Sequence, residues 1–433
     1  MINKVFTMLA LLAIAAPVHD ASSQGEADST NLLNIERRRE QFPKDFSYFV
    51  YPIAGRIPGL GTAAGGGVTV TNIKETNVDV TGFHVDGDFR ATGLAVLDVH
   101  LIPERLILYS GYYLFKVAPM QYSRGIDSSK DDYILPEAEG QVFVGQLTLS
   151  FRDRMFEVYT RYGHGVEKLN RVLDKNGNEF SNVDKNWRTF NVLNLGFTLD
   201  MTDDIQDPRK GIRMELVRAG ILDTAGGNSS FNVYDYNLTA YVPVGRHNTW
   251  AFNIFFSDPV RQSAGTTDRD ELRSELGLQC GSIPDPTARG ECEAVENQYL
   301  DEWVASNRYG RATALGGTQR LRSYSNGRYY AGHSIFYGTE FRWNLTEERK
   351  LIDFFFFKGT RTNLQLAFFG GIGSVADSQG DLQNKMRSSY GVGFRVLFSG
   401  VTIRLDYAVG GEGGEMQLFF DYPWSMFSVD NPV

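Results

Sequence analysis

The chain is 433 residues long, its hydrophobic fraction is 42% and its formal net charge is -9 at pH 7. Such a length fits two ordinary domains or one large barrel, and the acidic balance excludes a nucleic-acid binder, which needs a basic surface for its phosphate contacts. Mean hydropathy is -0.27, and beyond the N-terminus no apolar run approaches the ~20 residues of a membrane-spanning helix, which excludes a helical membrane protein.

The N-terminus has the composition of a secretory signal peptide. Lys4 precedes an apolar run from Val5 to Val18, and the polar stretch Asp20 to Gln24 follows. The run is too short for a comfortable membrane span. We therefore expect a cleaved signal over residues 1–24, with a retained anchor as the alternative.

Residues 25–45 are polar and include the charged run Glu36 to Glu40. About twenty residues are too few for a folded domain. We expect a short periplasmic segment here, which either forms a solvated helix or stays disordered.

From Phe46 onward, apolar and polar residues alternate with a period of two, which is typical of strands with one apolar face. The expected strands run for about 9 to 13 residues, longer than the strands of soluble sheets and matched to a tilted crossing of a bilayer. Clear examples are Phe89–Leu101, Phe143–Arg152, Phe156–Tyr162, Trp250–Ser257 and Val401–Tyr407.

The links between these strands alternate in length. Tight turns are expected at Pro103-Glu104, Asp153, Gly245-Arg246 and Ser399-Gly400, and longer loops at 118–139, 166–187, 259–330 and 376–387. Long loops on one side and short turns on the other are typical of outer-membrane barrels, and a soluble sandwich does not predict them.

The expected fold is therefore an all-β transmembrane antiparallel β-barrel of about 16 strands. It covers residues 46–424, with a link at 346–360, a last strand from Glu415 to Trp424, and a periplasmic tail at 425–433. The order of the first three strands is the least defined part.

The chain has two cysteines, Cys280 and Cys292, in a polar segment of the long loop. Export from the cytoplasm favours a disulfide between them, with two free thiols as the alternative. No histidine lies near them, so a zinc site is disfavoured, and we expect no cofactor.

Motifs for catalysis are missing from the sequence. The glycines at Gly59, Gly61 and Gly65 approach a phosphate-loop spacing, but no helical pattern follows them. No nucleophile and base constellation is visible, so we expect a protein that is not an enzyme. Strand parity instead points charged side chains into the barrel lumen, where opposite signs predict a packed ionic lining; they are Glu340, Arg342, Arg395, Arg404 and Asp406.

Several segments resemble one protein family. Leu321-Arg322-Ser323-Tyr324, after Gly316-Gly317, is similar to a VRGF motif in a loop that folds back into a barrel, and Glu340 in GTEFRW matches the acidic residue of the adjoining wall strand. The stretches 199–211 and 404–408 are similar to an aspartate-rich turn and a penultimate strand. Over residues 190–424 the chain thus resembles the bacterial surface antigen barrels of the outer-membrane protein assembly and translocation superfamily, of the BamA and TamA type.

This sequence departs from the family pattern at two positions. The motif glycine is Ser323, and Gly371 stands where a second acidic partner is expected. The resemblance implies that Arg322 pairs with Glu340, supplemented by Asp406. In the alternative, Arg322 is solvated and Glu340 pairs with Arg342 or Arg404. The loop-to-barrel contact is expected to use Gly316, Gly317, Arg322, Tyr324, Glu340 and Asp406.

The resemblance also implies an integral protein of the bacterial outer membrane, in contact with its lipid and inserted by the assembly machinery. One hypothesis is insertion or translocation of a polypeptide client. The family's periplasmic POTRA domains do not occur in the sequence, so a separate periplasmic or lipoprotein partner is expected. The alternative is a plugged or narrow channel, or a structural surface antigen. A seam with few hydrogen bonds between the first and last strands favours the former, and a well-paired seam favours the latter.

Overall fold

The computed structural model describes residues 36–424 apart from 43–44, 178, 180–184, 222–228, 277, 279, 347–351, 361, 399–400 and 421. The expected signal peptide, the C-terminal tail and the turn at Ser399-Gly400 lie outside the described residues. The sheet and its loops belong to a unit that begins at Arg37.

Strands dominate this unit. In the first half they are β1 (Ser47–Ile57), β2 (Gly61–Thr71), β3 (Asp79–Gly87), β4 (Arg90–Ile102), β5 (Leu106–Val117), β6 (Gln121–Tyr122), β7 (Tyr133–Phe151), β8 (Phe156–Asp174) and β9 (Trp187–Thr202). In the second half they are β10 (Gly211–Ile221), β11 (Ser230–Val244), β12 (Asn248–Ser263), β13 (His333–Asn344), β14 (Ile352–Phe354), β15 (Phe357–Thr360), β16 (Thr362–Ala376), β17 (Arg387–Phe398), β18 (Val401–Gly410) and β19 (Gly413–Phe420).

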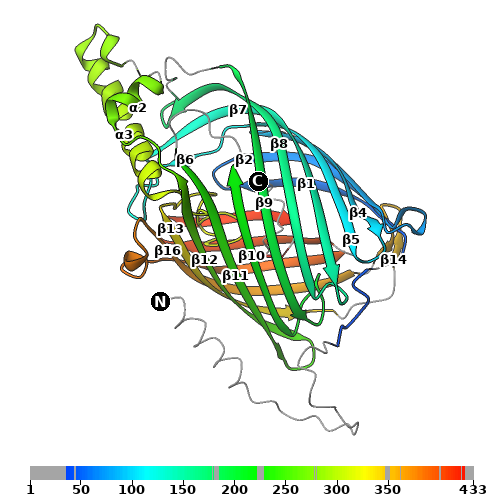
Figure 1. Cartoon of the computed structure of the whole chain (residues 1–433). Helices are drawn as coiled ribbons and strands as arrows, with labels where there is room; N and C mark the ends of the chain where they lie inside the picture. Colours follow the sequence, from blue (N-terminus) through cyan, green and yellow to red (C-terminus); the bar gives the residue numbers. More distant parts are fainter. Residues whose placement is uncertain are drawn as a thin grey trace. The chain divides into compact units, whose positions relative to one another are not determined.

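These strands form one antiparallel sheet in chain order. Each long strand pairs with the long strands before and after it, apart from the outer edges of β1 and β19. Among the described residues the series comprises β1 to β5, β7 to β13 and β16 to β19, sixteen strands in all. The predicted β-barrel of about 16 strands is confirmed, and Figure 1 shows the sheet curving round on itself.

Within the part of the chain that the structure describes, helices are confined to the loops. Most belong to the long loop between β12 and β13, which carries α2 (Arg269–Glu275), η2 (Cys280–Ser282) and α3 (Pro286–Tyr309). Asp285 caps α3 by accepting from the N–H groups of Thr287 and Ala288, which satisfies donors that have no helical partner. The short turns η1 (Ile73–Glu75) and η3 (Gln379–Asp381) lie elsewhere. In the described part of the chain, no helix has the length and apolar character to cross a membrane.

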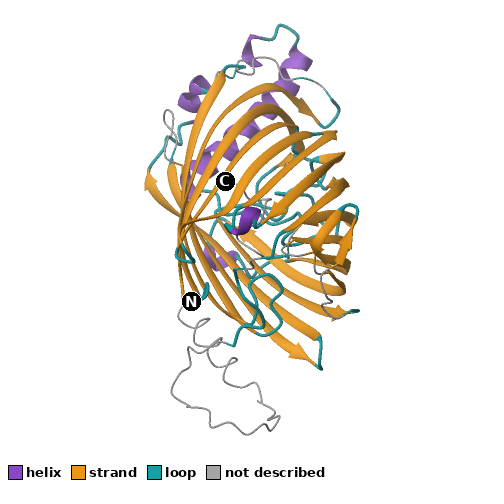
Figure 2. Ribbon diagram, turned by 90° about the vertical axis from the view of Figure 1, so that its right-hand side faces the viewer, coloured by secondary structure: helices purple, strands orange, loops and turns teal. Residues whose placement is uncertain are grey.

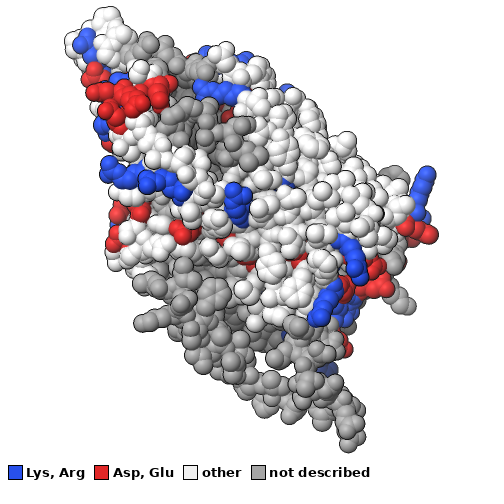
Figure 3. Space-filling model, viewed as in Figure 1, with Lys and Arg blue, Asp and Glu red and all other residues white. Residues whose placement is uncertain are grey.

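The two faces of the sheet differ in the way that the alternation predicts. On β12 and β13, Trp250, Phe252 and Trp343 are exposed, whereas Ala251 and Glu340 are fully buried. On the face seen in Figure 3, charged side chains gather over α2 and α3 and at the opposite end, and the strand surface between them carries few. A belt with few charges between two charged rims fits a barrel that sits in a bilayer.

Several predicted boundaries were wrong. The strands β7 and β8 have 19 residues each, longer than the expected 9 to 13, because they continue beyond the span that a bilayer needs. The long loop covers 264–332 and not 259–330, since β12 extends to Ser263.

The segment before β1 is neither a solvated helix nor disordered over residues 37–42, and here the prediction was wrong. Arg37 donates to Asp200 Oδ1 at 3.0 Å, Arg38 donates to Asp204 Oδ2 at 3.0 Å, and Arg39 donates to Gln206. Charge complementarity with the turn after β9 therefore holds these arginines in place. We call residues 37–42 the arginine strap.

Asp204 and Asp207 of that turn are buried, which carboxylates almost never are unless they are paired. Burial opposes the charge of Asp207, but Arg209 and Arg38 outweigh it and hold the pKa of this carboxyl below its usual range. The hydroxyl of Tyr422 also donates to Asp207 at 2.7 Å.

The last strand ends at Phe420, not at Trp424 as predicted. Beyond it Tyr422 and Trp424 are buried. The backbone N–H of Trp424 donates to Gln319 at 2.6 Å, and its carbonyl accepts from Asn237 at 2.6 Å. Pro423 lacks an N–H group and cannot extend a ladder, so the chain leaves the sheet and turns into the lumen.

Candidate functional site in the barrel lumen

The part of the long loop that follows α3 lies inside the barrel, and we call residues 310–332 the lumen loop. It contacts inward-facing groups on strands far apart in the sheet. Thr313 Oγ1 donates to Asp235 of β11 at 2.7 Å, and the N–H of Ser323 donates to Ser389 of β17 at 2.9 Å. Figure 2 shows loop segments enclosed by the curved strands.

A pair of glycines sets the path of the lumen loop. Gly316 and Gly317 have φ values of 111° and 97°, a region that side chains disfavour. A Cβ atom on Gly316 would lie 2.2 Å from the carbonyl oxygen of Ser325. The N–H of Gly317 donates to the carbonyl of Tyr324 at 2.9 Å. The pair thus closes a tight turn that presents Arg322 to the wall.

Arg322 is the centre of the contact between loop and wall. Its Nη2 lies 2.8 Å from Glu340 Oε2 on β13, and its Nη1 lies 2.9 Å from Asp406 Oδ2 on β18. The guanidinium also stacks 3.9 Å from the ring centre of Phe369, a cation-π contact. Arg322 is only 3% exposed, so it is not the solvated residue of the alternative.

Glu340 accepts from three arginines at once. Besides Arg322, it accepts from Arg342 Nε at 2.9 Å and from Arg395 at 2.8 and 2.5 Å. The alternative that Glu340 pairs with a wall arginine is therefore right for Arg342. It is wrong for Arg404, which pairs with Asp406 at 3.2 Å.

Asp406 is the second carboxylate partner of Arg322, because no room is left for a side chain at Gly371, where the family's second acidic residue is expected. A Cβ atom on Gly371 would lie 2.6 Å from the ring of Phe336 and 3.0 Å from the carbonyl oxygen of Tyr337. Phe336 is buried and packs against Gly371 across the β13–β16 ladder. Asp406 reaches the same guanidinium from β18 instead.

The remaining motif positions are also packed against the wall. Ser323 replaces the motif glycine, and Gly410 of β18 makes room for it, since a Cβ atom there would lie 2.2 Å from Ser323 Oγ. Tyr324 is buried, and its hydroxyl accepts from the N–H of Gly411 at 3.0 Å.

Sequence reasoning missed a second group of contacts near the extracellular end. Arg328 is fully buried, and its Nη2 lies 2.7 Å from Glu412, in the link between β18 and β19. Its Nη1 donates to Ser128 Oγ at 2.8 Å. The only sign of these contacts in the sequence is that arginine recurs within the motif segment.

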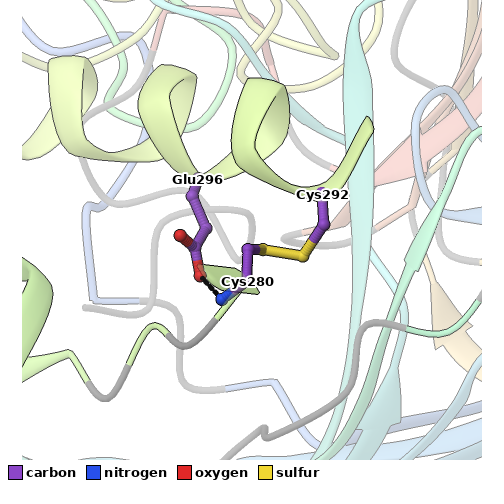
Figure 4. A group of neighbouring side chains, drawn as sticks. All are labelled: Cys280, Cys292 and Glu296. Atoms are coloured by element: carbon purple, nitrogen blue, oxygen red, sulfur yellow. Dashed lines mark hydrogen bonds between the residues drawn. A yellow bond between two sulfur atoms is a disulfide. The ribbon is translucent and has the colours of Figure 1, made fainter. Parts of the chain in front are cut away.

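Cys280 and Cys292 are joined by a disulfide that ties η2 to α3 (Figure 4). Their Cα atoms lie 5.6 Å apart. Glu296, one turn further along α3, accepts from the N–H of Cys280 at 2.8 Å. These three residues form the one group in the described part of the chain with ligand atoms close enough for a metal. The sulfur atoms are bonded to each other, so they offer no thiolate ligand.

The arrangement is a buried cluster of charges that joins the loop to the wall. We call Arg322, Glu340, Arg342, Arg395, Arg404 and Asp406 the ionic clamp. Its four guanidinium groups and two carboxylates are buried and bonded to one another, which offsets their desolvation. Because one member lies on the loop and the others on β13, β17 and β18, the clamp fixes the loop across the lumen.

The fold and the clamp define a transmembrane β-barrel with an extracellular loop folded into its lumen. The sequence profile of the Omp85 superfamily domain matches residues 146–418, which is more than half of the chain. The chain therefore belongs to the Omp85 superfamily and is an integral protein of the outer membrane. No curated protein sequence matches it.

Solved structures resemble the fold at low sequence identity. BamA from Haemophilus ducreyi lacking POTRA domains 1-3 is 11% identical, with a TM-score of 0.45 over 87% of this chain and 69% of that one. CdiB from Escherichia coli is 10% identical, with a TM-score of 0.48 over 86% and 61%, and CdiB from Acinetobacter baumannii is 10% identical, with a TM-score of 0.46 over 86% and 58%. The chain spans less than two thirds of either CdiB chain.

Proposed function

We propose that this protein inserts polypeptides into the outer membrane, or translocates them across it, together with a separate periplasmic or lipoprotein partner. The client passes at the seam between β1 and β19. The lumen loop, held by the ionic clamp, keeps the barrel interior closed while the client passes at the seam.

The observation that carries the proposal is the state of this seam. A Cβ atom on Gly55 of β1 would lie 2.8 Å from Leu418 Cβ of β19, so the two strands touch. Nevertheless, no backbone ladder joins them in the described residues, although every other neighbouring pair of long strands has one. Unpaired strand edges are a template for another extended chain, and a channel or a structural antigen gains nothing from them.

The test locks the seam. In the double variant Gly55→Cys and Leu418→Cys, the two Cβ atoms would lie 2.8 Å apart, so a small outward shift of the strands brings them to the spacing of a disulfide. Oxidation in cells should reduce the amount of client polypeptide in the outer-membrane and extracellular fractions, measured by quantitative proteomics, and a reductant should restore it. The matched control is Phe368→Cys with Val392→Cys, directly opposite each other on the paired strands β16 and β17.

An unchanged protein profile with the seam locked would overturn the proposal. If the locked barrel also conducts ions steadily in planar bilayers, the protein is a channel instead. Since the control pair experiences the same oxidant and reductant, effects on the native disulfide appear in both variants and cancel.

A further inference from the structure

The link between β13 and β16 contains a hairpin, β14–β15, which the sequence pattern did not predict. In the sheet, three strands separate β16 from β1, namely β17, β18 and β19. Even so, β15 pairs with β1, with Tyr48 opposite Lys358 and Phe49 opposite Phe357. Figure 1 shows β14 at the end of the sheet away from α2 and α3.

This hairpin takes the place that β19 leaves empty. Leu418 lies beside Gly55, but β19 ends two residues later whereas β1 begins eight residues earlier, at Ser47. The first residues of β1 would therefore lack a neighbour on that side. The N–H of Val50 donates instead to the carbonyl of Phe356 at 2.8 Å.

Gly359 allows the close approach of the hairpin to β1. Its φ is 64°, and a Cβ atom there would lie 2.5 Å from the carbonyl oxygen of Phe46. Its N–H donates to Asp353 Oδ1 at 2.8 Å across the hairpin. A side chain at this position would push the hairpin away from β1.

The tip of the hairpin carries two exposed aromatic side chains. Phe355 is 82% exposed and Phe356 is 52% exposed, and their ring centres lie 4.9 Å apart. Phe356 is opposite Val50, which in turn is opposite Val68 of β2. Cross-strand neighbours share a face, and both valines are exposed on the outer face.

The outer face of an outer-membrane barrel contacts lipid. The tip therefore continues the lipid-facing surface of β1 and β2. Aromatic side chains at a barrel rim settle at the level of the lipid headgroups, and the exposed Lys358 beside them suits phospholipid phosphate.

We propose that the β14–β15 hairpin binds the periplasmic leaflet of the outer membrane through Phe355, Phe356 and Lys358, and that it holds the start of β1 on the edge that faces β19, where the described part of the chain forms no ladder to β19. The ligand is phospholipid. The hairpin thereby anchors one edge of the seam to the bilayer.

The first test measures where the tip lies. The native disulfide leaves no free thiol in the described residues, so Phe355→Cys carries one site for a fluorescent probe. The matched control is Arg246→Cys, exposed in the turn between β11 and β12 at the same rim. In vesicles of phosphatidylethanolamine and phosphatidylglycerol, nitroxide lipids should quench the probe at 355, and aqueous iodide should quench the probe at 246.

Equal iodide quenching at the two positions overturns lipid binding. Shielding of the probe at 355 that requires an added outer-membrane extract also overturns it, because a protein partner then covers the tip.

The second test measures the attachment to β1. Oxidation of the double variant Tyr48→Cys and Lys358→Cys should give an internal disulfide, since paired strands hold opposite Cα atoms within disulfide reach. Adding Gly359→Ala should slow this cross-link about tenfold, because a left-handed backbone and the Phe46 carbonyl both disfavour a side chain there.

The matched glycine control is Gly245→Ala, whose φ is 63° and whose Cβ would meet nothing within 4 Å. It should leave the cross-linking rate unchanged. An absent cross-link without these glycine changes, or equal rates in all variants, overturns the attachment. Both tests report the position of the hairpin and need no client, so their failure is distinct from failure of the seam-lock test.

Discussion

Arg322 Nη2 lies 2.8 Å from Glu340 Oε2, and neither side chain is accessible to solvent beyond a few per cent. The two residues nevertheless have unequal roles. Removing Arg322 leaves Glu340 with Arg342 and Arg395, and leaves Asp406 with Arg404. Removing the charge of Glu340 leaves three guanidinium groups without their shared carboxylate.

Arg322→Ala should therefore loosen the lumen loop and spare the wall. The lost charge-assisted hydrogen bonds are worth about 1.5–3 kcal/mol each. Limited proteolysis in detergent should cut the variant within residues 310–332, while its heat-modifiable mobility on gels stays normal. Uncut loop in this variant would show that the clamp does not hold it.

Glu340→Gln should cost more, about 3–5 kcal/mol, because it leaves buried charges unpaired. Both the loop and the unfolding midpoint of the barrel should be affected, as measured by proteolysis and by denaturant titration. The double variant with Arg322→Ala should be less destabilised than the sum of the single effects, since the two residues share one network. Fully additive losses of stability in the double variant would show that Arg322 and Glu340 do not belong to one network.

The acidic anchor on β18 gives a further prediction. Asp406→Asn should release the loop to protease, but less than Arg322→Ala does, since it removes one of the two carboxylates that Arg322 contacts and leaves Glu340 in place. Gly371→Asp, which restores the family's acidic position, should not rescue Asp406→Asn. The reason is steric, because the ring of Phe336 occupies the space of a side chain at 371. Recovery of protease resistance in that double variant would contradict this packing argument.

Local pattern predicted the wall of the barrel well. Alternation placed Glu340, Arg342, Arg395, Arg404 and Asp406 inside, since the period of a strand is fixed and one face must meet lipid. The strand count and the loop between the eleventh and twelfth long strands follow from the same regularity.

Features that depend on contacts between distant segments could not be predicted in this way. The arginine strap looks solvated in sequence, because Asp200 and Asp204, which bind it, lie 163 and 166 residues away from their partners. The β14–β15 hairpin resembles an ordinary link because its partner is β1. Likewise, the role of Asp406 depends on Phe336 filling the site beside Gly371, which no spacing reveals.

The disulfide should stabilise the extracellular helices and not the barrel. Cys280 and Cys292 are 12 residues apart, and closing a loop of this size contributes about 3 kcal/mol. The double variant Cys280→Ser and Cys292→Ser should become sensitive to protease within residues 264–309 and keep its barrel mobility. Folded wild-type protein should resist thiol labelling until a reductant is added. Ready labelling without reductant would contradict an oxidised pair.

The strap predicts a pH dependence with a definite sign. The folded-state pKa of Asp207 lies below its usual value, so ionised Asp207 stabilises the fold at pH values above its unfolded pKa of about 4. This contribution disappears as the pH falls through the lower, folded-state value.

At pH 7, Asp207→Asn should lower the free energy of unfolding by about 1.5–3 kcal/mol, because it removes the charge from the hydrogen bonds with Arg38 and Tyr422. Denaturant titrations at a series of pH values should show the variant and the wild type converging below pH ~4. The control Asp270→Asn changes an almost fully exposed carboxyl on α2 and should follow the wild type throughout. A difference between Asp207→Asn and the wild type that is equally large at pH 7 and at pH 3 would mean that the charge of Asp207 does not hold the strap.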